Sequence, residues 1–172
     1  MIINKTILLL LFTFCAFGIQ AQGMGTTNFG LFSSDQGMLN SYFGYQAGNS
    51  TTGSNNTANG YKALLSNTSG VNNTAIGADA MGSNIDGNQN IAIGVAALYF
   101  NTGGHQNTAN GADALFSNTT GSQNIANGRQ ALYFNITGSQ NTALGHGAGY
   151  GASGINFNQC TFVGASSFPT VA

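Results

Sequence analysis

The sequence predicts an all-β fold, a parallel β-solenoid in which short strands stack in about nine short coils along one axis. The first observation is a motif, Asn-Thr-Ala-Ile-Gly at Asn73–Gly77, that recurs along the chain. The second is its constant period, because six motif glycines are evenly spaced: Gly60, Gly77, Gly94, Gly111, Gly128 and Gly145. A 17-residue period is too short for a helical hairpin and suits one turn of a β-solenoid.

The composition is the third observation. Charged residues make up 4% of the chain, Glu is absent, and 26 of the 172 residues are Gly. Helical globular proteins use far more charged residues on their surfaces. Disordered chains have few aromatic residues, whereas this chain has 12 Phe and 6 Tyr. A net charge of −1 leaves no basic surface for nucleic acid.

Residues 1–21 are expected to be a signal peptide. Lys5 supplies the positive end, and Ile7–Ile19 is an apolar run too short to span a bilayer comfortably. We therefore predict an exported protein, extracellular or on the outer cell surface, with residues 22–165 as the repeat domain and 166–172 as a tail. After cleavage Cys160 is the single cysteine, so no intrachain disulfide is expected.

Each coil is expected to begin with a strand that ends at the motif glycine. Degenerate first and last copies lie at Thr26–Gly30, Asn40–Gly44 and Cys160–Gly164. Successive side chains of a strand point to opposite faces. Because Thr74 and Ile76 are bulky and branched, we expect them to face the interior, with Ala75 outside. Asn59, Asn110 and Asn127 share the Ile76 position and would then lie inside as well.

A second strand is expected at Ala80-Met81, with Met81 in the core and Ala80 on the opposite side. Seven residues after each of the first five evenly spaced motif glycines comes an Asn, and identical stacked Asn side chains can form a hydrogen-bonded ladder. The predicted ladder consists of Asn67, Asn84, Asn101, Asn118 and Asn135.

The position after the core Leu carries large apolar side chains that are expected on the outer surface. A repeated apolar column on an outer face is typical of an interface. The candidate interface residues are Leu65, Tyr99, Phe116 and Tyr133. We expect several coils to associate along this column.

Two copies of the motif resemble the head repeat of trimeric autotransporter adhesins, the YadA-like head: Asn72-Asn-Thr-Ala-Ile-Gly77 and Gln89-Asn-Ile-Ala-Ile-Gly94. The resemblance covers about residues 26–165, although the usual repeat of that family is shorter and matches only the interval from Gly30 to Gly44. It implies a left-handed parallel β-roll, a homotrimer, and a place at the tip of a surface fibre. Residues after Gly164 show neither heptads nor anchor strands, so we expect a head secreted alone or a piece of a longer fibre.

Groups that could support catalysis are sparse. Asp79 and Asp113 share one repeat position two coils apart, which separates them by roughly 10 Å. His105 and His146 lack the further ligands that a metal would need. The glycines of residues 149–154 match a dinucleotide-binding pattern, but without the strand and helix around it. We expect no enzyme activity and no catalytic residue, metal site, cofactor or small-molecule substrate.

Three functions remain from the sequence. The first is an adhesin-like head that attaches to host, matrix or neighbouring cells through many weak contacts to an unknown surface ligand. The second is a purely structural segment of a trimeric fibre, as in a phage tail fibre. The third is an ice-binding solenoid, which the expected inward direction of the Thr column disfavours.

Overall fold

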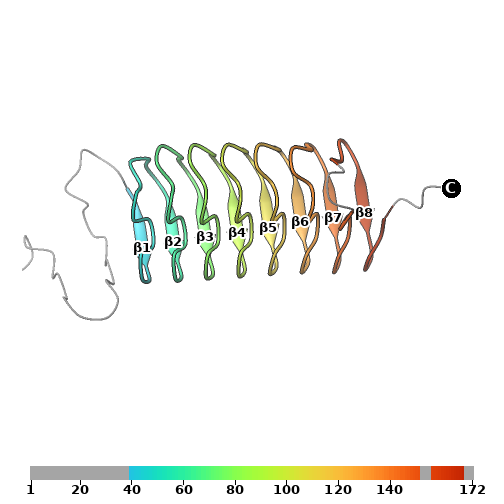
Figure 1. Cartoon of the computed structure of the whole chain (residues 1–172), viewed down its shortest axis with the longest axis horizontal. Helices are drawn as coiled ribbons and strands as arrows, with labels where there is room; N and C mark the ends of the chain where they lie inside the picture. Colours follow the sequence, from blue (N-terminus) through green and yellow to red (C-terminus); the bar gives the residue numbers. More distant parts are fainter. Residues whose placement is uncertain (1–38, 152–155, 169–172) are drawn as a thin grey trace, which may run out of the picture.

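The computed structural model of the chain describes residues 39–151 and 156–168. They form a rod of stacked coils with one strand in each coil (Figure 1). The expected signal peptide and the copy at Thr26–Gly30 that would make a ninth coil lie outside the described residues. So do residues 152–154 of the glycine-rich pattern and the end of the expected tail.

The strands form one parallel sheet in sequence order, and about seven turns of a β-solenoid connect them. Ile76 pairs with Ile93, and equivalent residues pair in the same way throughout the sheet, so the strands are in register. The expected parallel solenoid is therefore confirmed. The strands are β1 (Ser41–Phe43), β2 (Thr57–Asn59), β3 (Thr74–Ile76), β4 (Ile91–Ile93), β5 (Thr108–Asn110), β6 (Ile125–Asn127), β7 (Thr142–Leu144) and β8 (Thr161–Val163).

Hydrogen bonds between coils continue beyond the strands. In the return segment Met81 N donates to Ala97 O at 2.9 Å, and Ser83 N donates to Tyr99 O at 3.0 Å. Each coil thus satisfies the backbone of the next one along much of its circumference. The repeated sequence places equivalent residues beside one another in successive coils, and the first and last pairs of strands keep this register although their coils differ in length.

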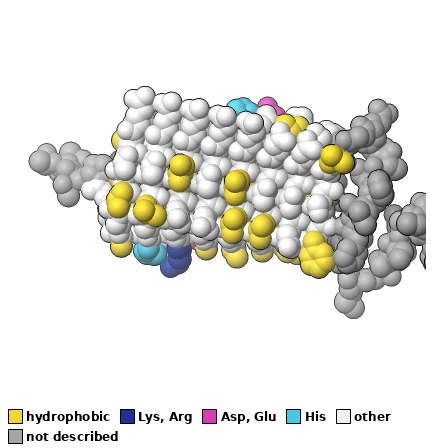
Figure 2. Space-filling view, turned by 180° about the vertical axis from the view of Figure 1, so that it is seen from behind, with side chains coloured by type: hydrophobic (Ala, Val, Ile, Leu, Met, Phe, Trp, Pro, Cys, Tyr) yellow, Lys and Arg dark blue, Asp and Glu magenta, His cyan; other side chains and the backbone are white. Residues whose placement is uncertain are grey.

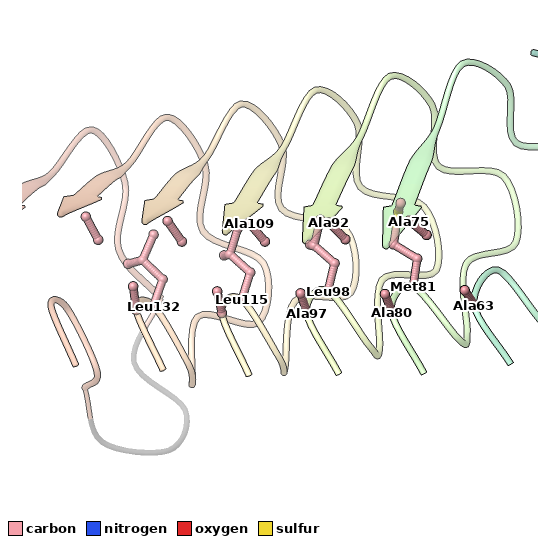
Figure 3. Close-up of a cluster of buried hydrophobic side chains, with 14 of the residues drawn as sticks. Ala63, Ala75, Ala80, Met81, Ala92, Ala97, Leu98, Ala109, Leu115 and Leu132 are labelled. Carbon is pink, nitrogen blue, oxygen red and sulfur yellow. The ribbon is translucent and has the colours of Figure 1, made fainter. Parts of the chain in front are cut away.

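The core is a single narrow layer of small and medium side chains inside the coils (Figure 3). Ala75 and its equivalents in β2 to β7 are fully buried, as are Ala80, Met81 and their equivalents. The expected direction of the strand side chains is wrong. Ala75 points inward, whereas Thr74 is half-buried and Ile76 is exposed on the outer face.

The narrowness of the coil explains this inversion. In β2 to β6 the inward side chain packs across the coil toward Met81 or the equivalent Leu, and the space admits a methyl group in this position (Figure 3). The branched side chains therefore go outside. Asn59, Asn110 and Asn127, expected inside, are exposed instead, which removes the cost of burying their amides. At the two ends of the sheet the residues equivalent to the inward Ala are Tyr42 and Phe162, whose rings lie against glycines at the Leu position, Gly48 and Gly149.

Ala80 was expected opposite the core residue Met81, yet both are buried. Met81 has a left-handed backbone with φ of 49°, so the alternation of faces is broken at this point. Equivalent leucines have φ between 51° and 53°. Such a backbone costs about 1–2 kcal/mol for a residue other than Gly. Coil-to-coil bonds such as Leu98 N to Ala114 O at 2.9 Å offset this cost.

The chain turns a corner directly after each strand, and this corner requires the motif glycine. Gly94 has φ of 132°, and a Cβ there would lie 2.6 Å from the carbonyl carbon of Gly111 in the next coil. A side chain at this position is excluded both by conformation and by space.

We predict that Gly94→Ala lowers the free energy of unfolding by about 2 kcal/mol or more, because it adds backbone strain and a clash. Gly103→Ala is the matched control, since a Cβ there would meet only the Asp86 carboxylate oxygen, at 3.0 Å. Chemical denaturation followed by circular dichroism measures both. Equal stability of the two variants would contradict the stacking described here.

Candidate functional surfaces

The predicted Asn column lies inside the coil. Asn84 Nδ2 donates to Asn67 Oδ1 at 2.6 Å, and Asn101 and Asn118 continue the ladder at 2.7 and 2.8 Å. Each amide also donates to the carbonyl three residues later, for example Asn101 to Gly104 at 3.0 Å. Asn135 departs from the pattern, because its Oδ1 accepts from Phe157 N at 3.1 Å and no bond joins it to Asn118. Asn135 precedes the coil between Gly145 and Gly164, which is two residues longer than the 17-residue coils.

A second Asn ladder was missed. The first residue of each motif is buried, and its Oδ1 accepts from the next coil: Asn73 Oδ1 accepts from Asn90 N at 3.0 Å and from Asn90 Nδ2 at 3.2 Å. Its members are Asn56, Asn73, Asn90, Asn107, Asn124 and Asn141. The signal was the constancy of Asn at this position in six motifs. Asn73 lies on the same face of the strand as Ala75, so the prediction that Ala75 faces outward put Asn73 and its equivalents on the outside as well.

We predict that Asn101→Ala lowers the free energy of unfolding by about 3 kcal/mol, because the side chain makes three buried hydrogen bonds of about 1 kcal/mol each. Asn110→Ala is the control: its amide is exposed and makes one bond of 3.3 Å to Asn127. Denaturation curves should show little change for Asn110→Ala. A similar loss in both variants would mean that the buried ladder is not a main source of stability.

The outward side chains of the strands form the first candidate surface, here named the strand face. Its two columns are uncharged, and because the strands are parallel and in register it is regular from coil to coil. Figure 2 shows hydrophobic side chains in rows on this side of the rod, with charged side chains near the margins. Six aliphatic side chains are 40–65% exposed: Ile76, Ile91, Ile93, Ile125, Leu144 and Val163.

The second surface, the aromatic flank, contains most of the predicted interface column. Tyr99, Phe116 and Tyr133 stack on one another with centroid distances of 5.6 and 5.0 Å, and Tyr150 extends the stack at 5.4 Å. Leu65 is separated from the stack, because Gly82 occupies the same position in the coil between them. Tyr150 was not among the predicted interface residues.

Phe100 and Phe134 complete the aromatic flank and were also missed. Phe100 lies edge-on to Tyr99 and Phe116, with centroids 4.8 and 5.1 Å away. Phe134 repeats this arrangement two coils later, whereas Ser117 holds the position between them. The rings therefore already cover much of each other within one chain.

Titratable groups are few at these surfaces. Burial raises the pKa of Tyr133, and the nearby Asp113 carboxylate and Tyr150 raise it further, so its hydroxyl stays neutral at physiological pH. The Tyr61 hydroxyl raises the pKa of Lys62, whose Nζ lies 5.0 Å from the Tyr61 ring centroid. At physiological pH Tyr133 is therefore uncharged and Lys62 is positively charged.

The remaining polar candidates do not assemble into one site. Asp79 and Asp113 lie two coils apart, and His105 Nδ1 accepts from Asn88 N at 3.0 Å. His146 lines a hollow of about 530 Å³ together with Tyr150 and Phe168. Among residues 39–151 and 156–168, no three His, Cys, Asp or Glu side chains come together in a way that could hold a metal. The same residues contain no helix able to cross a membrane.

Comparison of the chain with models of protein families, with curated proteins and with solved structures found no match. The strand face and the aromatic flank are therefore interpreted from their own geometry.

Proposed function

We propose that this chain is the head module of a secreted or cell-surface fibre, a homotrimer that attaches to host, matrix or neighbouring cells through repeated weak contacts. The observation that carries the proposal is the strand face, an uncharged surface with regularly spaced outward positions, six of which hold exposed aliphatic side chains. An exposed apolar array of this kind is typical of a surface that another chain covers.

The energetics favour association along the full length of the face. Covering a half-exposed Ile, Leu or Val gains about 1 kcal/mol, so the six side chains supply about 6 kcal/mol per chain. Association costs about 4–15 kcal/mol in lost freedom of motion. Copies therefore gain most when they lie side by side with all coils aligned. Three copies, rather than two, is the number that the resemblance to adhesin heads implies.

The column predicted as the interface, Leu65, Tyr99, Phe116 and Tyr133, is the second candidate for contact between copies. We favour the strand face because its six aliphatic side chains are 40–65% exposed, whereas the aromatic rings stack on one another. The aromatic flank then remains on the outside of the trimer. There it is repeated in each chain, as multivalent attachment requires.

We predict that Ile93→Lys abolishes self-association, because it brings positive charges together at a covered face. Val95→Lys is the matched control, since Val95 is 56% exposed in the same coil but lies beyond Gly94, outside the strand face. Sedimentation equilibrium at micromolar concentration should give a trimer for the native protein and for Val95→Lys, and a folded monomer for Ile93→Lys. A native protein that stays monomeric would refute the proposal.

We also predict that attachment falls in steps as coils are removed. Deleting the segment from Ala78 to Gly111 removes two coils and leaves the others in register. Adhesion to surfaces coated with matrix proteins or cells should weaken by a constant factor for each deleted pair of coils. If one deletion abolishes binding and another has no effect, a discrete site is present instead. If no variant attaches, the structural fibre segment becomes the better proposal.

Ice binding is the other candidate that the outward strand face favours. Thr57, Thr74, Thr108 and Thr142 lie in one outward column, which removes the objection that these side chains face inward. Ile91 and Ile125 still interrupt the column. Ice binding needs an uncovered strand face, so it predicts a monomer that halts ice growth. A trimer without effect on freezing excludes it.

A further inference from the structure

We propose that Asn59, Asn110 and Asn127 are latent deamidation sites, which the stacked coils hold unreactive and which react once the chain unfolds. Each of them directly precedes a motif glycine, and they are the only Asn-Gly pairs in the sequence. This chemistry is independent of the proposed function.

The fold itself creates these pairs. The corner requires Gly, because a Cβ at Gly111 would lie 2.6 Å from the carbonyl oxygen of Gly128 and φ is 139°. The residue before the corner lies on the strand face, where Ile, Leu and Val also occur. Any Asn in this outward position therefore becomes part of an Asn-Gly sequence.

In a flexible chain an Asn-Gly pair is chemically labile. The backbone nitrogen of Gly attacks Cγ of Asn, a bond forms between them, and Nδ2 leaves as ammonia. Water then opens the cyclic imide, giving either Asp or an isoaspartate whose backbone contains one additional carbon atom. Gly promotes the attack because it has no side chain to hinder it.

In the folded protein, hydrogen bonds between coils hold the backbone nitrogen of the motif glycine, which is the nucleophile of this reaction. Gly60 N donates to Phe43 O, Gly111 N donates to Ile93 O, and Gly128 N donates to Asn110 O, each at 2.8 Å. Attack would require the nitrogen to lose its proton and its hydrogen bond. It would also require the Asn to leave the extended conformation of β2, β5 or β6, which breaks the pairing on both sides.

Reaction after unfolding would prevent refolding. An isoaspartate lengthens a strand of only three residues and disturbs its pairing with the strands on either side. Asp would place carboxylates on neighbouring strands, because Asn110 and Asn127 are direct partners in the sheet. Like charges directly opposite each other in a sheet are destabilising.

The test compares the same protein with its coils folded and unfolded. Samples are incubated at pH 8 and 37 °C in buffer or in guanidinium chloride, and peptide mass spectrometry measures the gain of mass and the isoaspartate content at the three residues. We expect reaction at least about tenfold slower in buffer, because it must wait for local opening. Equal rates in the two samples would overturn the proposal.

A variant isolates the effect on refolding. Asn59→Ile, Asn110→Ile and Asn127→Ile combined use the residue that the same position holds at Ile76 and Ile93. After a long incubation in denaturant the native protein should recover its circular dichroism poorly, and the triple variant almost fully. Equal losses in both would show that deamidation at these residues does not limit refolding. If the variant does not fold, the mass spectrometry of the native protein still decides the question.

Discussion

The stacking of identical coils in register is the constraint on which the rest of this structure depends. Each coil takes its backbone hydrogen bonds from the coils on either side, as in the bond from Met81 N to Ala97 O. From β2 to β6 the interior enclosed by one coil is so narrow that it admits Ala from the strand and one Leu or Met from the return segment. Two columns of Asn amides complete it by bonding along the axis. Larger side chains are placed on the outside by lack of space.

The period and the position of the strand that ends at the motif glycine could be predicted from the sequence, because stacked coils of equal length repeat the sequence at fixed spacing. The prediction of a second strand at Ala80-Met81 is wrong, because these residues form a turn. Asn84 could be placed in a ladder because its position never varies between Asn67 and Asn135. The direction of the strand could not be predicted in the same way. Hydrophobicity favours Ile76 over Ala75 for a core, and only the width of the coil decides in favour of Ala75. The left-handed backbone at Met81, which buries Ala80 as well, has no counterpart in the alternation rule.

The inversion changes the functional interpretation. With Ile91 and Ile93 inside, the outer surface would be polar and the aromatic column would be the main apolar feature. With them outside, the rod has two repeated apolar surfaces of different kinds. The strand face is uncharged, and it combines six exposed aliphatic side chains with Thr and Asn side chains at regularly spaced positions. In the aromatic flank the rings pack against one another within the chain. Phe100 and Phe134 add edge-on rings two coils apart. This difference is the basis of the proposal that copies assemble through one surface and attach through the other.

Thiol labelling tests the central claim, that the strand face points outward and is covered by further copies of the chain. In a Cys160→Ser background, Ala92→Cys and Ile93→Cys place a thiol on opposite faces of β4. We predict that the thiol at position 92 is unreactive at every protein concentration in buffer. The thiol at position 93 should react in dilute solution and become protected as the concentration rises. A reactive thiol at position 92, or one at position 93 that stays equally reactive at all concentrations, would contradict this account.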